Sequence, residues 1–170
     1  MVFDTVREDA LLDLLNTTPV VRGVLDDSLA GPQGRQWALQ HGGTGTTAEL
    51  TILTSARDAL QRVVRGAATP EDLRELLRDV SSTPQIKGGK LVWSLRVPDD
   101  GRLPVDMILA WAGVQEARPG RLRPCENPEC RRFLLDRSKP NTARWCSMSG
   151  CGNRMKARRH YQRVKDNISR

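Results

Sequence analysis

The sequence has 170 residues and a formal net charge of +7, with 27 Lys plus Arg, 20 Asp plus Glu and 4 Cys. Its start, MVFDTVREDALLDLL, has no basic segment, no long apolar run and no small-residue cleavage site, and no later stretch is apolar for long enough to cross a bilayer. The sequence therefore predicts neither a secretory signal nor a membrane span, and we expect a cytoplasmic protein whose thiols are kept reduced.

The first 118 residues predict a mostly helical domain. Apolar residues recur at helical spacing in residues 7–16, 47–66, 69–80 and 104–117. The third of these helices has a start signal, with Thr69 as N-cap, Pro70 at the first position and Asp72 closing a capping box. Gly66 would end the second helix, and Pro119-Gly120 is interpreted as a linker.

The segment between the first two helices, GPQGRQWALQHGGTGTT, is rich in glycine. Gly42, Gly43 and Gly45 invite comparison with a phosphate-binding loop. The Gly-Lys-Ser/Thr ending of such loops is missing, however, and no convincing strand precedes the cluster. We therefore predict that residues 31–47 form a surface connection.

One strand is predicted within this domain. In KLVWSLRV, the side chains of Leu91, Trp93, Leu95 and Val97 fall on one face, which is typical of a half-buried strand. Ile86 lies before Gly88-Gly89, so we expect a partner strand joined through a tight hairpin.

All four cysteines lie in the last third of the chain, at Cys125, Cys130, Cys146 and Cys151. They form two C-x4-C pairs, and two close pairs across a short segment are what a tetrahedral four-thiolate site needs. An iron–sulfur cluster, disulfides or reactive thiols are the alternatives. Reduced thiols and the absence of C-x2-C runs favour one structural Zn²⁺.

The positive charge is concentrated around these cysteines. Residues 121–170 hold 14 Lys plus Arg against 4 Asp plus Glu, a formal +10, whereas residues 1–120 carry −3. RFLLD and ARWCS predict a hairpin, and a helix is expected from Cys151 to about Val164, with Ala157, Tyr161, Val164 and Ile168 as a stripe on the zinc core. We thus expect an α+β protein: a mostly helical N-terminal domain with a small β-hairpin, then a treble-clef-like C-terminal zinc finger.

The tetrapeptide Cys151-Gly152-Asn153-Arg154, within FLLDRSKPNTARWCSMSGCGNRMKARR, resembles the CGNR zinc finger family. DLLNT (Asp13 to Thr17) is similar to a pattern near the start of family members. The resemblance implies an ABATE-like α/β domain over residues 1–118 and a zinc finger over residues 121–170. It also implies a bacterial transcription regulator, and an RNA-binding role has been suggested for the finger.

A basic module of this kind predicts a nucleic-acid partner, with DNA favoured over RNA because the finger has few aromatic side chains for stacking. We expect contacts from basic residues of the loop and the last helix: Arg137, Lys139, Arg144, Arg154, Lys156, Arg158, Arg159, Arg163 and Lys165. One finger covers few base pairs, so we expect a homodimer formed by the first domain, which is also the expected place for a small-molecule ligand. A nucleoid-associated location follows. No acid–base pair can be named, so we expect no enzymatic activity.

Overall fold

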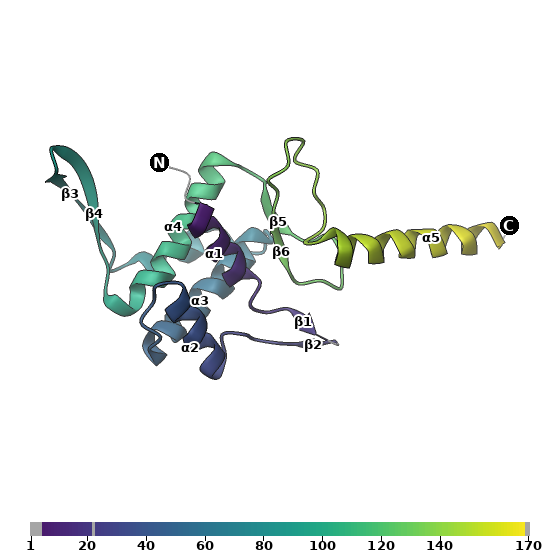
Figure 1. Ribbon diagram of the computed structural model, residues 1–170, viewed down its shortest axis with the longest axis horizontal. Helices are drawn as coiled ribbons and strands as arrows, with labels where there is room; N and C mark the ends of the chain where they lie inside the picture. The colour runs from purple at the N-terminus through teal and green to yellow at the C-terminus, as the bar shows by residue number, and fades with distance from the viewer. Residues whose placement is uncertain (1–4, 22, 169–170) are drawn as a thin grey trace.

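The computed structural model describes residues 5–21 and 23–168 and shows helices joined with small antiparallel hairpins (Figure 1). The helices of the body are α1 (Thr5–Leu15), α2 (Gly31–Gln40), α3 (Thr47–Val64) and α4 (Arg102–Ala117). Short 3-10 segments cover Pro70–Leu77 (η1) and Asp99–Gly101 (η2). The predicted α+β class is confirmed, and so are the predicted helices at 7–16, 47–66 and 104–117; in place of the α-helix expected over residues 69–80, Pro70–Leu77 form a 3-10 segment.

Helices α1, α3 and α4 pack on one another and enclose the core of the body. Leu14, Leu53 and Leu60 are completely buried there. Helix α3 begins at a genuine cap, because the Thr46 hydroxyl accepts a hydrogen bond from the Glu49 N–H at 3.1 Å. It ends before Gly66, whose φ of +71° is the left-handed conformation that stops helices. Within the described residues, no helix has the length and apolar character needed to span a bilayer.

Helix α2 occupies most of the segment that the sequence predicts to be a surface connection, so that prediction is wrong for residues 31–40. Pro32 lies in the first turn, where its missing N–H costs nothing. Gly34 is required by packing, since a Cβ at this position would lie 1.9 Å from the carbonyl oxygen of Leu29. Glycine therefore marks close backbone contact here and does not mark a loop.

A buried polar network anchors a very short hairpin, β1 (Val20–Val21) and β2 (Val24–Leu25), that the sequence analysis missed. The guanidinium of Arg57, on α3, is buried and donates two hydrogen bonds to the Asp27 carboxylate, at 2.6 and 3.0 Å. The Gln61 amide donates to the Leu15 carbonyl and to the Thr18 hydroxyl. These bonds fix both ends of the hairpin to α3.

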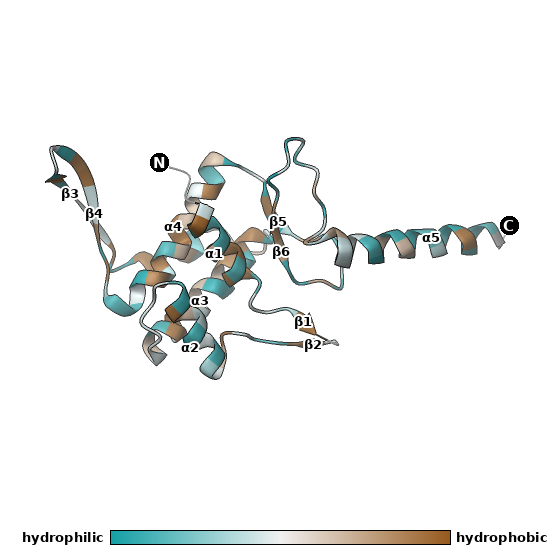
Figure 2. Ribbon diagram, in the orientation of Figure 1, coloured by the Kyte–Doolittle hydropathy of each residue, from teal (hydrophilic) through white to brown (hydrophobic). Residues whose placement is uncertain are grey.

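The second hairpin, β3 (Ser81–Lys87) and β4 (Lys90–Arg96), projects away from the body (Figure 1). Gly88 and Gly89 both have positive φ, as the two-residue turn requires. The hairpin is confirmed, but the prediction of a half-buried strand is wrong: Leu91 and Trp93 are 62% and 66% exposed. Figure 2 shows the resulting hydrophobic colour on a hairpin whose residues 81–91 are all exposed among the described part of the chain.

The C-terminal part consists of β5 (Leu122–Pro124), β6 (Phe133–Leu135), the π-helical turn η3 (Met148–Gly152) and α5 (Asn153–Ile168). The predicted hairpin between RFLLD and ARWCS is wrong, because β6 pairs with β5, with Leu122 opposite Leu135 and Pro124 opposite Phe133. The first cysteine pair lies in the connection between these strands. The segment around Trp145 is instead an irregular loop that leads into η3.

Candidate metal centre and basic helix

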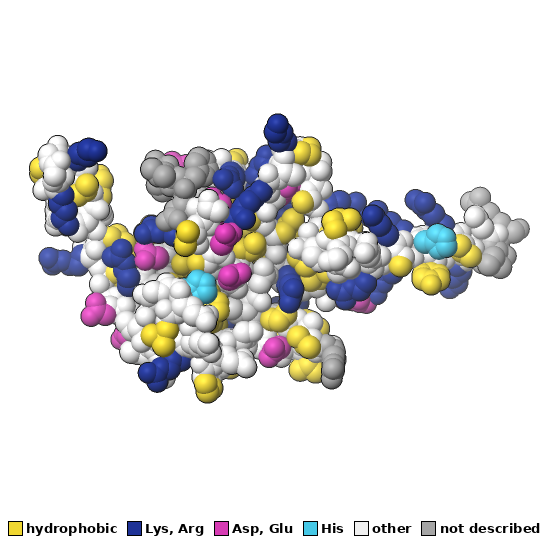
Figure 3. Space-filling view, in the orientation of Figure 1, with side chains coloured by type: hydrophobic (Ala, Val, Ile, Leu, Met, Phe, Trp, Pro, Cys, Tyr) yellow, Lys and Arg dark blue, Asp and Glu magenta, His cyan; other side chains and the backbone are white. Residues whose placement is uncertain are grey.

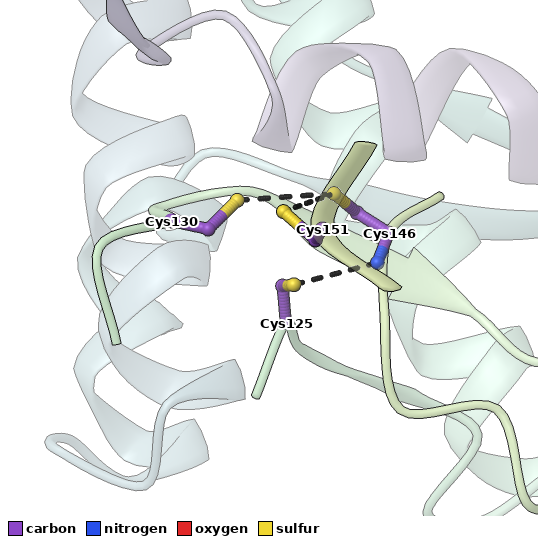
Figure 4. Close-up of side chains that lie close together, drawn as sticks. All are labelled: Cys125, Cys130, Cys146 and Cys151. Atoms are coloured by element: carbon purple, nitrogen blue, oxygen red, sulfur yellow. Dashed lines mark hydrogen bonds between the residues drawn. The ribbon is translucent and has the colours of Figure 1, made fainter. Parts of the chain in front are cut away.

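The four thiols converge on one point, although they come from separate segments (Figure 4). Cys125 directly follows β5, Cys130 lies in the β5–β6 connection, Cys146 precedes η3 and Cys151 lies within it. The four Sγ atoms lie within 4.8 Å of one another, with 3.8 Å between Cys130 and Cys146 and 3.7 Å between Cys146 and Cys151. A tetrahedral site with Zn–S bonds of about 2.3 Å needs S···S separations of about 3.8 Å, so the residues fit the metal.

The turn between the first two cysteines is built around Asn127, whose side chain is buried. Its Oδ1 accepts from the Glu129 N–H at 3.2 Å, and its backbone carbonyl accepts from the Cys130 N–H at 2.8 Å. Its Nδ2 points the other way and donates to the Sγ of Cys151 at 3.4 Å. One amide thus shapes the first turn and also supports a sulfur from the second pair.

Further donors face the sulfurs. The Cys146 N–H lies 3.4 Å from the Sγ of Cys125, and the Arg154 guanidinium lies 3.3 Å from the Sγ of Cys151. Burial disfavours the Cys151 thiolate, but hydrogen bonds from Asn127 and the neighbouring thiols lower the pKa of Cys151 to about 7. Burial raises the pKa of Cys130 and of Cys146. For Cys146, the nearby thiols raise the pKa further. A bound cation would remove that penalty by favouring the thiolates.

The CGNR tetrapeptide has a physical explanation at each position. Cys151 is a thiol of the cluster, and Arg154 reaches back to that same sulfur. A Cβ at Gly152 would lie 2.9 Å from the Met148 Sδ and 3.2 Å from the Trp145 ring, so a larger residue would require the Met148 side chain to shift. The Asn153 amide donates to the Ser149 carbonyl at 3.4 Å and joins η3 to the first turn of α5.

A buried carboxylate shapes the loop that carries the predicted tip residues. Asp136 accepts hydrogen bonds from the N–H groups of Ser138 and Ala143 and from the Arg123 guanidinium, each at 2.8 Å. Hydrogen bonding from Ser138 outweighs the effect of burial, and with Ala143 and Arg123 it lowers the pKa of Asp136 to about 2. The sequence analysis gives Asp136 no role. The available signal was a Ser two residues after this Asp, a spacing at which an Asp side chain often accepts a backbone hydrogen bond.

The finger is joined to the body by side chains as well as by the chain. Asn16, just after α1, accepts a hydrogen bond from the Phe133 N–H at 2.7 Å and donates to the Phe133 carbonyl at 3.3 Å. The Phe133 ring is 1% exposed and belongs to the same core as Leu11 and Leu14. The Arg65 guanidinium stacks 4.4 Å above that ring. The Asn of DLLNT therefore binds the outer edge of β6.

Helix α5 extends from the metal site into solvent (Figure 1). Every residue from 156 to 167 is exposed, including Tyr161 at 74% and Val164. The expectation that an apolar stripe of α5 packs on the zinc core is therefore wrong. The side chain of Ile168, a predicted member of that stripe, lies outside the described residues. Figure 3 shows Lys and Arg side chains along α5 with few acidic side chains among them.

The residues predicted to contact nucleic acid fall into two groups. Three form ion pairs within the protein: Arg137 with Asp9 and Glu8, Arg144 with Glu126, and Arg158 with Glu129. The others are exposed at the loop tip or along α5, and Arg154 also touches the metal site: Lys139, Arg154, Lys156, Arg159, Arg163 and Lys165. Their role in binding stays a prediction.

Four convergent thiolates held by a β5–β6 connection, an irregular loop and the start of a helix define a zinc finger with one structural Zn²⁺. More specifically, residues 121–164 match the family model of the CGNR zinc finger. No curated protein matches the chain. The resemblance noted in the sequence is thus confirmed for the finger.

Proposed function

We propose that the protein binds DNA through α5 and acts as a bacterial transcription regulator located at the nucleoid. The observation that carries the proposal is the state of α5, a helix of 16 residues that extends free of the body. It has six Lys or Arg residues against one acidic residue, Asp166. An exposed helix with this excess of positive charge is suited to bind a polyanion.

The dimensions of α5 agree with this partner. Sixteen residues span about 24 Å, and a single helix fits the major groove of B-form DNA, which is about 12 Å wide. Because basic side chains emerge around most of the helix, those on either side of it could contact both phosphate backbones of one groove. The metal site fixes the first turn of α5 through Cys151 and Arg154, so the direction of the helix is set before binding.

We prefer DNA to RNA because the finger has few exposed aromatic side chains on which unpaired bases could stack. Of the three aromatic residues in the finger, Phe133 is in the core and Trp145 is half-buried, which leaves Tyr161 exposed. Single-stranded recognition relies on several exposed aromatic rings. RNA is the second candidate, and Tyr161 beside basic neighbours is the observation in its favour. We propose a binding role without catalysis.

Binding is measured by fluorescence anisotropy with a labelled 20-base-pair duplex at several salt concentrations. Replacing Arg159 and Arg163 by Ala should reduce affinity and flatten the plot of log K against log salt by about 2, since each lost phosphate contact changes the slope by about 0.9. The control replaces Arg62 and Arg74, two exposed basic residues of the body, and should leave the slope unchanged. Equal effects of the two double variants, or tighter binding to single-stranded RNA, would refute the proposal.

A further inference from the structure

Helix α5 has an inner side that faces the rest of the finger. The Arg154 guanidinium lies 3.3 Å from the Sγ of Cys151, and Arg158, about one turn further along, forms an ion pair with Glu129 in the turn between the first two cysteines. At about 100° per residue, Arg154 and Arg158 point within about 40° of each other on a helical wheel. The metal site and the cysteine turn therefore occupy this side of the first two turns of α5.

The outer side of α5 carries a row of residues at the spacing i, i+4, i+7 and i+11. On a helical wheel these residues fall within about 60° of one another, and the centre of the row lies nearly opposite Arg158. All of them are exposed. They are called the outer row below: Lys156, His160, Arg163 and Asn167. The row is therefore open to a partner.

The charges of the outer side indicate a polyanion as that partner. Lys156 and Arg163, together with Arg159 at the edge of the row, form no ion pair within the part of the chain that the structure describes. The one acidic residue of α5, Asp166, lies beyond Arg159 on the wheel and accepts a hydrogen bond from Gln162 at 2.8 Å, on the side away from the outer row. The positive charge of the outer side is thus available to phosphate groups, whereas on the inner side a carboxylate and a thiol already face the arginines.

We propose that the outer row enters the major groove of duplex DNA, and that His160 and Asn167 contact base edges there and determine which sequence is preferred. Lys156, Arg159 and Arg163 supply the phosphate contacts, and the inner side stays on the protein. This inference rests on the proposed function and deepens it, since it states which side of α5 meets DNA and which residues read the sequence.

Both side chains have the hydrogen-bonding groups that base recognition needs. An Asn amide has a donor and an acceptor, which match N7 and N6 of adenine, and a neutral imidazole has one donor and one acceptor. His160 and Asn167 are seven positions apart, or about 10 Å along the helix axis. A helix that lies along the groove would thus place them about three base pairs apart, at about 3.4 Å for each base pair. The preferred site should therefore have two specified positions at that separation, with adenine at one of them.

The first test asks which side of α5 contacts DNA. Arg158→Gln and Arg159→Gln remove the same charge from adjacent residues, one on the inner side and one on the outer side. Gln is about as good a helix former as Arg, and circular dichroism and zinc content confirm that both chains are folded. With the full zinc-loaded chain and a 20-base-pair duplex, Arg159→Gln should flatten the plot of log K against log salt by about 0.9, whereas Arg158→Gln should leave it unchanged. An equal or larger change for Arg158→Gln would overturn the assignment of sides.

The second test asks whether the outer row reads sequence. The full zinc-loaded chain selects duplexes from a randomised 20-base-pair library, and the preferred positions are compared between variants. His160→Ala and Asn167→Ala should each lose at least about fivefold discrimination at one position, and the position should differ between them. The control Gln162→Ala, about 160° around the helix from His160, should keep both preferences.

The outcomes separate this inference from the proposed function. A wild-type chain that selects no sequence but keeps a steep salt dependence would overturn base recognition by the outer row and leave DNA binding by α5 standing. Loss of preference in Gln162→Ala, or unchanged preference in both His160→Ala and Asn167→Ala, would overturn it as well. A wild-type chain that does not bind duplex DNA even at 50 mM salt would refute the proposed function, and this inference with it.

Discussion

Replacing Asn16 by Ala should loosen the finger from the helical body. The amide of Asn16 makes two hydrogen bonds to the backbone of Phe133, whose ring is in the shared core. Its loss leaves an N–H and a C=O of β6 without these partners at a largely buried site. Each unmade bond of this kind costs about 1–1.5 kcal/mol, so we expect unfolding to become easier by about 2–3 kcal/mol. For a chain of this size, that corresponds to a fall in Tm of about 5–10 °C.

Two comparisons make the test specific. Asn16→Asp keeps the acceptor for the Phe133 N–H but loses the donor to the carbonyl, so it should lose about half as much stability. Asp13→Ala, on the exposed side of α1, removes a 4.0 Å pairing with His41 and should change stability by less than about 0.5 kcal/mol. Urea unfolding followed at 222 nm gives the free energies, and a colorimetric chelator gives the rate of zinc release. An Asn16→Ala chain with wild-type stability and wild-type zinc release would refute this account of the junction.

Four further predictions concern the metal, the loop, the body and the basic helix. Cys151→Ser should remove zinc and unfold residues 121–170, since metal binding supplies folding energy in such sites, and elemental analysis with circular dichroism would check it. Asp136→Asn should speed amide exchange at Ser138 and Ala143; because the pKa of Asp136 is lowered to about 2, its stabilisation is complete above about pH 4 and is lost as the pH falls towards 2. Arg57→Met should destabilise the body by about 2–3 kcal/mol in urea unfolding, less than a fully buried ion pair because Asp27 is partly exposed. The full chain should bind duplex DNA with a slope of log K against log salt of about −5 to −7, and a flat response would point to a protein partner.

Periodicity and ligand spacing were the reliable signals in the sequence. The helices α1, α3 and α4 follow from apolar residues at helical spacing, and the metal site follows from two matched cysteine pairs. Both signals are local, since helical spacing and each C-x4-C pair depend on residues only a few positions apart.

The wrong predictions concern which other part of the chain covers an apolar face or pairs with a strand. Alternation correctly identified a strand at residues 90–96 but could not show that its apolar face is uncovered, and the same limit applies to the stripe on α5 with Tyr161. The strand RFLLD could pair with either flank, and the choice of β5 depends on the thiol cluster and on buried Asp136, which are tertiary features. In α2, Gly34 resembled a loop residue because its close contact with Leu29 is invisible in sequence.

The predicted boundary at Pro119-Gly120 marks a real turn in the chain, with Gly120 at a φ of +70°. Side chains from both sides of it nevertheless share one core, because Leu122 and Phe133 pack with residues of α1 and α3. A Pro-Gly pair in the sequence indicates where the backbone turns. It does not show whether the segments on either side bury their apolar surface together.

The bond between Asn16 and Phe133 joins residues 117 positions apart, which has a consequence for synthesis on the ribosome. At about 5–20 residues per second, α1 would emerge roughly 6–25 s before the strand that completes its packing. During that interval the surface of α1 that receives Phe133 is open, and non-local closure of this kind is slow. The core around α1 would therefore be completed only when the last 50 residues have emerged. A chain truncated before β6 should be a substrate for chaperones.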